Sequence, residues 1–162
     1  MEKERSDKLC DAEMLFHMLL FAYEKSVRDI LATGHVIFVH PTLSLLREIS
    51  EKEGIDLTKA KTVDEAFERF SSMLKDSGLV KEVQFEKLGP DKYMLHVDKC
   101  IYAKRLHQSL KPLCKDATCR YALIAMAILE KFCNSNAKLN TSDFTPEGTK
   151  TIIECLSKET KQ

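Results

Sequence analysis

The sequence has few glycines: only five among 162 residues, and each falls at a predicted helix end or turn. No glycine-rich segment is left to cradle a phosphate, and the chain contains neither a GxGxxG motif nor a P-loop. The GxSxG motif of serine hydrolases and the HExxH motif of zinc proteases are also missing. These absences exclude the enzyme classes that a short local motif identifies.

Net charge and long apolar runs are missing as well. Lys+Arg and Asp+Glu number 25 each, so no overall field attracts nucleic acid or an anionic membrane surface, and we expect neither partner. The apolar run from Met14 to Tyr23 covers ten residues and is interrupted by His17, whereas a membrane span needs about 20. Because the chain starts with charged residues instead of a signal peptide, we expect a cytoplasmic protein without a membrane span.

The composition is that of a single soluble domain over residues 1–162, with 44% hydrophobic and 31% charged residues. Ser6 can cap a long N-terminal helix within residues 1–33, which Gly34 ends. This helix carries two neighbouring apolar stripes, more than one packing partner usually covers. We therefore predict that it is a dimerisation element and that the protein is a symmetric homodimer.

The order of the remaining predicted elements indicates an α+β fold. A capping box at Thr62–Glu65 begins one helix, and GPDK at 89–92 forms the turn of a hairpin. The predicted order is helix, helix, hairpin, helix, central apolar helix, loop and hairpin, over residues 41–53, 62–77, 79–98, 100–110, 117–133, 134–138 and 139–157. We expect N-terminal helices, an antiparallel β-sheet built from the two hairpins, and a central apolar helix.

Six cysteines are many for a chain without a secretory signal, which favours free thiols or a metal site over a disulfide framework. We interpret Cys10, Cys133 and Cys155 as packing residues. The other three, Cys100, Cys114 and Cys119, cluster within 20 residues and need a separate explanation.

The spacing C-x6-H-x6-C-x4-C places Cys100, His107, Cys114 and Cys119 as candidate zinc ligands, since tetrahedral zinc prefers thiolate and imidazole. Cys119 falls near the start of the apolar helix, where the helix dipole favours a thiolate. One straight helix would separate Cys100 from His107 by about 10 Å. Either Cys100 precedes the helix, or His96 replaces His107. Buried thiols without metal and a reversible disulfide between Cys114 and Cys119 are the alternatives.

Two segments, CIYA at 100–103 and CKDATCRYALIAMAIL at 114–129, resemble the vinyl-4-reductase family of predicted hydrocarbon-binding domains. The resemblance extends from about Leu31 to the C-terminus. Ile101 stands where the family often has proline, and the terminal hairpin keeps Cys155 alone. The matching residues are Cys100, Tyr102, Ala103, Cys114, Asp116, Cys119 and Tyr121.

The resemblance implies a fold similar to that of subunits of the transport-particle tethering complex, thiols suited to a metal, and a tendency to dimerise. It also implies an apolar pocket in residues 34–162, for which we expect Tyr102, Tyr121 and Met126 as lining residues. The predicted function is therefore a cytosolic module that binds a small, hydrocarbon-like ligand beside a zinc site. The alternatives are a metal-dependent hydrolase or reductase that uses the same site, and a dimeric scaffold whose cysteines only pack.

Overall fold

The computed structural model describes residues 59–103, 107 and 118–156, together with positions 15, 18–19, 22–23, 25–27, 29–30, 44–45 and 48. The described positions between 15 and 30 and between 44 and 48 are helical, in agreement with the helices predicted there. The rest of those two segments lies outside the described residues, as do Cys10, Cys114 and Asp116.

Helix α3 (Val63–Asp76) begins where the capping box predicts. The Thr62 hydroxyl accepts a hydrogen bond from the backbone N–H of Glu65 at 3.1 Å, and the Glu65 carboxylate accepts one from Lys61 N–H at 2.8 Å. Together the two bonds satisfy backbone donors that a helix start otherwise leaves unpaired. The apolar face of the helix is buried and consists of Ala66, Phe67, Phe70 and Leu74.

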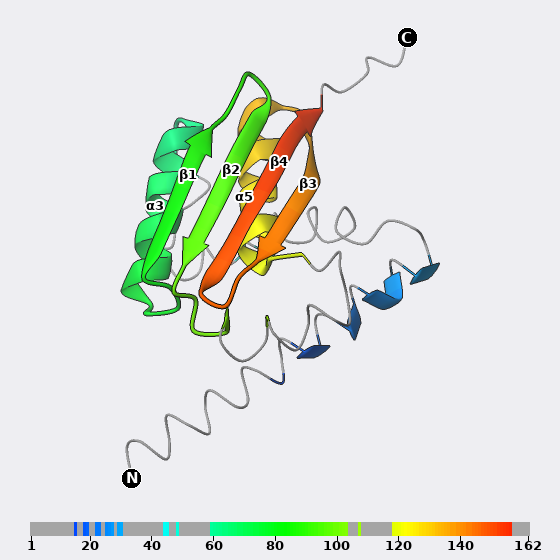
Figure 1. Cartoon of the computed structure of the whole chain (residues 1–162). Coiled ribbons are helices and arrows are strands. Elements are labelled where there is room, and N and C mark those ends of the chain that lie inside the picture. Colours follow the sequence, from blue (N-terminus) through cyan, green and yellow to red (C-terminus); the bar gives the residue numbers. More distant parts are fainter. Residues whose placement is uncertain are drawn as a thin grey trace.

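The sheet consists of two hairpins, as the sequence predicts. Strands β1 (Glu82–Lys87) and β2 (Lys92–Asp98) form the first, and β3 (Asn136–Phe144) and β4 (Gly148–Leu156) form the second. The strand order is β1-β2-β4-β3, and every neighbouring pair is antiparallel (Figure 1). Strands β2 and β4 therefore join the hairpins, over a register that ends with Asp98 opposite Gly148.

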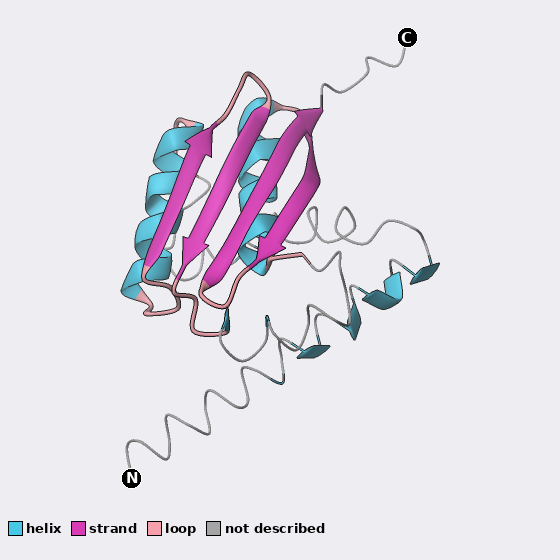
Figure 2. Ribbon diagram, in the orientation of Figure 1, coloured by secondary structure: helices cyan, strands magenta, loops and turns pink. Residues whose placement is uncertain are grey.

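Helices α3 and α5 (Arg120–Cys133) lie on the same face of this sheet (Figure 2). The arrangement is a two-layer α+β fold with the core between the layers. Helix α5 is the central apolar helix of the prediction, and eight of its 14 residues are buried. The largest fully buried side chains are Phe70, Leu95, Met126, Leu129, Ile153, Val97 and Thr151.

Two predicted boundaries are wrong. The sequence predicts a loop over residues 134–138, but β3 begins at Asn136 because Ala137 is buried and pairs with Cys155. The polar neighbours of Ala137 point to the outside of an edge strand, which hides the alternation of a half-buried strand. Helix α5 begins at Arg120 rather than 117, and Cys119 is its N-cap residue.

Candidate functional site

Cys119 lies at the N-terminal end of α5 in extended backbone conformation. Its carbonyl accepts hydrogen bonds from the N–H groups of Ala122 and Leu123, and its side chain makes no capping hydrogen bond. Instead, the thiol sulfur accepts a hydrogen bond from the Thr149 hydroxyl on β4, at 3.2 Å between Oγ1 and Sγ. Helix α5 is thereby attached to the start of β4 through a fully buried contact.

Cys100 reaches the same end of the sheet from β2. The strand ends at Asp98, and Lys99 then adopts a left-handed conformation with φ 50 that turns the chain. The Cys100 N–H donates to the carbonyl of Glu147 at 3.0 Å, so the residue is fixed to the turn between β3 and β4. Its side chain is buried.

His107 is bound to that turn as well. Its Nδ1 lies 2.7 Å from the carbonyl oxygen of Thr145, and its ring meets the Phe144 ring edge-on, with 4.8 Å between centroids. Because a carbonyl can only accept, Nδ1 carries the hydrogen and Nε2 keeps its lone pair. Burial lowers the pKa of His107, which keeps the ring neutral. A neutral histidine whose other nitrogen is held by a backbone carbonyl has the form that metal-binding histidines take.

His96, the alternative ligand, lies on the other face of the sheet. Its neighbours on β2, Leu95 and Val97, are both buried in the core, and successive side chains of a strand point to opposite faces. Cys100 and His107 thus bind the turn between β3 and β4, and Cys119 contacts the start of β4 next to it, whereas His96 does neither.

Two tyrosines and an arginine surround the thiols. The Arg120 guanidinium lies over the Tyr102 ring at 5.4 Å from its centroid, a cation–π distance. The Tyr121 hydroxyl is buried without a hydrogen-bond partner among the described residues. It is still close enough to Cys100 to lower the pKa of that thiol, against the larger effect of burial. No described carboxylate forms an ion pair with Arg120.

Burial dominates the protonation of both thiols. It raises the pKa of Cys100 and of Cys119, and the proximity of Cys100 raises the pKa of Cys119 further. The N–H groups of Tyr121 and Ala122 at the start of α5 lower the pKa of Cys119, as the helix dipole predicts. The helix end thus favours a thiolate as expected, but desolvation outweighs those N–H groups and the net shift of the Cys119 pKa is upward.

The described part of the chain contains no group of three or more His, Cys, Asp or Glu side chains that could hold a metal ion. Two of the four predicted ligands, Cys100 and Cys119, approach each other, and His107 binds the same turn. The remaining ligand, Cys114, lies outside the described residues.

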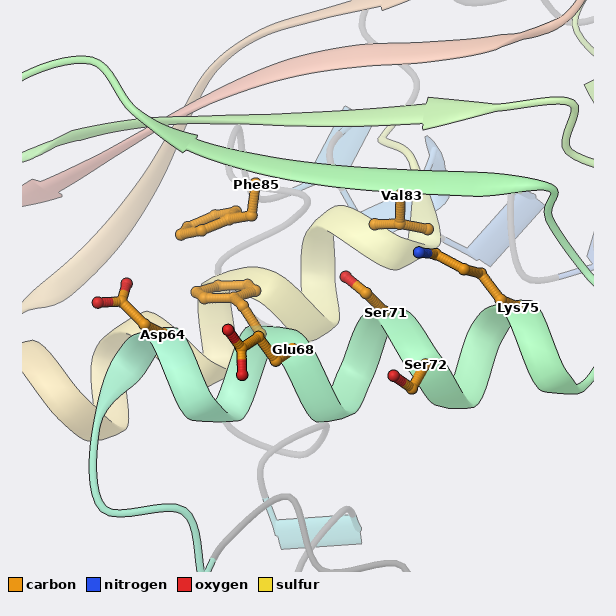
Figure 3. A pocket seen from close by; sticks show the side chains of 8 residues that line it. Asp64, Glu68, Ser71, Ser72, Lys75, Val83 and Phe85 are labelled. Atoms are coloured by element: carbon orange, nitrogen blue, oxygen red, sulfur yellow. The ribbon is translucent and has the colours of Figure 1, made fainter.

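The predicted pocket residues all lie in the core. Met126 is fully buried, and Tyr102 and Tyr121 are almost fully buried beside the thiols. A concave surface is found elsewhere, between α3 and the edge strand β1 (Figure 3). Its volume is about 580 Å³, and its lining residues are Asp64, Phe67, Glu68, Ser71, Ser72, Lys75, Val83 and Phe85.

The sequence does not indicate four contributors to the site: Arg120, Thr145, Glu147 and Thr149. Thr149 had one detectable signal, because it occupies an inward position of a strand in which Thr151 and Ile153 are also buried. Arg120 follows Cys119 directly, but its position over Tyr102 depends on a residue 18 positions away. Thr145 contributes a backbone carbonyl, which no side-chain pattern indicates.

Comparisons with known proteins find no matching family model, no similar curated protein and no similar solved structure. Among the described residues, no helix is both long and apolar enough to cross a membrane.

Proposed function

We propose that the chain is a small-molecule-binding module of the vinyl-4-reductase type. In this proposal Cys100, Cys114, Cys119 and His107 hold one zinc ion next to a small apolar ligand. The observation that supports it best is the approach of two buried thiols, Cys100 and Cys119, beside the turn between β3 and β4, to which His107 also binds. The three residues come from separate parts of the chain: Cys100 follows β2, His107 lies between β2 and α5, and Cys119 is the N-cap residue of α5. Side chains that only fill the core do not need to be brought together in this way.

The charges of the site fit bound zinc. Buried thiols with a raised pKa stay protonated at neutral pH, but zinc binding replaces the thiol protons. Three thiolates carry more negative charge than one zinc ion neutralises, and Arg120 lies beside both described thiols without a described carboxylate partner. Four protein ligands would also leave no open position, which favours a structural zinc over a catalytic one.

The first test is the zinc content of the purified full-length protein. We expect one zinc per chain in the wild type, measured by native mass spectrometry and elemental analysis, and its loss in Cys100→Ser, Cys114→Ser and Cys119→Ser. Zinc that binds only the folded chain stabilises it, so a chelator should lower the melting temperature by roughly 10 °C.

The matched control is Cys155→Ser, because Cys155 is as buried as Cys119 but lies at the other end of β4. It should retain zinc and respond to the chelator as the wild type does. A wild-type protein prepared without chelators that contains no zinc, or a Cys119→Ser variant that keeps it, contradicts the zinc site. The same native spectra report whether the chain is a dimer, as the exposed Leu15, Leu19 and Tyr23 of the first helix lead us to propose.

The second test concerns the ligand. The Tyr121 hydroxyl is buried close to Cys100 and makes no hydrogen bond of good geometry with the described residues, so we assign it to a polar atom of the ligand. We expect an organic molecule to co-purify with the wild type, detectable by mass spectrometry of a solvent extract. Tyr121→Phe removes a buried hydroxyl that has no hydrogen bond of good geometry, so it should leave the melting temperature unchanged or raise it while reducing the amount of bound molecule. Equal retention by both proteins, or an extract without any such molecule, argues against this assignment.

A further inference from the structure

Two other cysteines approach each other at the opposite end of α5. Cys133 is the last residue of the helix and is exposed. Asn134 then takes a left-handed conformation, with φ 48, and turns the chain into β3. On β3, Ala137 pairs with Cys155, the buried penultimate residue of β4. The end of α5 and the end of β4 therefore lie at the same end of the fold (Figure 1).

Tyr93 connects the two thiols. It faces Ile153 in the register between β2 and β4, so Cys155, two residues further on, lies diagonally across on the same inward face. The backbone confirms this position, since Cys155 N–H donates to the Asp91 carbonyl at 2.8 Å. The Tyr93 hydroxyl in turn lies 3.9 Å from the sulfur of Cys133.

The electrostatics show the same proximity. Burial raises the pKa of Cys155 to about 11, and Cys133 contributes to the rise through its charge and through a hydrogen bond between the side chains. Burial likewise raises the pKa of Tyr93 to about 12, again with contributions from Cys133 and Cys155. The Ser135 hydroxyl, buried without a hydrogen bond of good geometry, acts in the other direction and lowers the pKa of Cys155.

A metal site does not explain this cluster, because the described His, Cys, Asp and Glu side chains form no group of three that could hold a metal ion, although the Asp91 carboxylate lies near enough to raise the pKa of Cys155. Packing alone explains the buried Cys155 but not the exposed thiol placed against it. Two neighbouring thiols, one open to solvent and one shielded, are the arrangement in which an oxidant reaches the first and the second completes a disulfide.

We propose that Cys133 and Cys155 form a reversible disulfide when the protein meets a peroxide. The Cys133 thiolate attacks one peroxide oxygen, the O–O bond breaks, and the other oxygen leaves as water after protonation. Cys133 is then a sulfenic acid. The sulfur of Cys155 attacks the sulfur of Cys133, the S–O bond breaks, and the second oxygen leaves as water with the Cys155 proton. The two thiols supply the two electrons that reduce the peroxide, and a dithiol reductant reverses the reaction.

This pair is independent of the proposed zinc site. A helix of 14 residues is about 21 Å long, and Cys119 and Cys133 lie at its two ends. The disulfide would link the end of α5 to the end of β4. A cross-link that closes such a loop stabilises the folded chain relative to the unfolded chain.

The test uses the reduced full-length protein, treated with hydrogen peroxide, alkylated and digested with trypsin without reduction. Trypsin releases Cys133 in residues 132–138 and Cys155 in residues 151–158, each as the single cysteine of its peptide. We expect these two peptides to appear linked after peroxide and to separate again after dithiothreitol. The oxidised protein should melt about 5–10 °C higher than the reduced protein.

The variants assign the two roles. Cys133→Ser should leave Cys155 reduced, and Cys155→Ser should leave a sulfenic acid on Cys133 that dimedone traps. Cys10→Ser serves as the control and should form the linked peptides in the wild-type yield. Wild-type protein in which Cys133 is oxidised to sulfinic or sulfonic acid while Cys155 remains open to alkylation after unfolding overturns the proposal, as does linkage of Cys133 to any other cysteine. Because the wild type alone decides this, the result does not depend on whether the variants fold.

Discussion

Gly148→Ala is expected to destabilise the protein by about 3 kcal/mol, the upper part of the range for forced overpacking. A Cβ at Gly148 would lie 1.8 Å from the carbonyl oxygen of Val97 and 2.8 Å from its carbonyl carbon. These are backbone atoms of the neighbouring strand, which cannot rotate away as a side chain can, so β2 and β4 must separate. Urea unfolding followed by circular dichroism measures the loss.

The same substitution should also reduce the zinc content of any protein that still folds. Gly148 lies between Glu147, whose carbonyl holds Cys100, and Thr149, whose hydroxyl holds Cys119. Gly89→Ala is the matched control, because the nearest atom to a Cβ there is Lys92 Cβ at 3.9 Å, an ordinary contact. It should change the free energy of unfolding by less than about 0.5 kcal/mol. Equal stabilities for the two variants would show that β2 and β4 are not packed as described.

Leu95→Ala is expected to lower the free energy of unfolding by about 2–5 kcal/mol, the usual range for truncating a fully buried leucine side chain. Leu95 is 0% exposed and lies on β2, opposite Phe85 on one side and Thr151 on the other. Neighbours on both adjacent strands restrict how far the sheet can collapse into the cavity. Chemical denaturation should give a lower midpoint with an unchanged dependence on denaturant concentration.

Leu156→Ala provides the comparison, because it makes the same change in a strand of the same sheet at a residue that is 46% exposed. We expect a loss of less than about 1 kcal/mol, in proportion to the smaller apolar area it buries. If the two substitutions lower the free energy of unfolding equally, Leu95 on β2 does not lie in the core.

The two ends of α5 carry the two chemical proposals. At its start, Cys119 is fixed by Thr149 and shielded from solvent, which suits a permanent ligand set. At its end, Cys133 is exposed beside the buried Cys155, which suits a reaction with a solute. The same residue type therefore has different expected chemistry at the two ends because its exposure differs.

The sequence alone determined the elements that depend on near neighbours. The capping box at Thr62–Glu65 predicted the start of α3, and its bonds join residues at most four positions apart. Both hairpins follow from a turn with alternating residues on either side. The apolar run within 117–133 predicted α5 as the central helix, because so many apolar side chains need burial whatever covers them. The α+β class was predictable because it follows from the order of these helices and hairpins along the chain.

The sequence could propose Cys100 and Cys119 as partners only from their residue types. Their approach depends on β2 pairing with β4, which places Asp98 opposite Gly148 and brings the turn between β3 and β4 beside Cys100. That pairing joins segments about 50 residues apart, and it is selected by the fit of two complete inward faces rather than by any local preference. The prediction of where β3 begins was wrong for the same reason: Ala137 becomes an inward-facing strand residue only by pairing with Cys155 on β4.

Tertiary structure alone decided what surrounds each of the four cysteines that the structure describes. Cys133 and Cys155 read as packing residues in the sequence, and only the meeting of the ends of α5 and β4 around Tyr93 makes them a pair. Burial, not position at a helix start, sets the protonation of Cys119. Solvent exposure and charge partners are properties of the assembled fold, because they depend on which distant segments exclude water from a side chain.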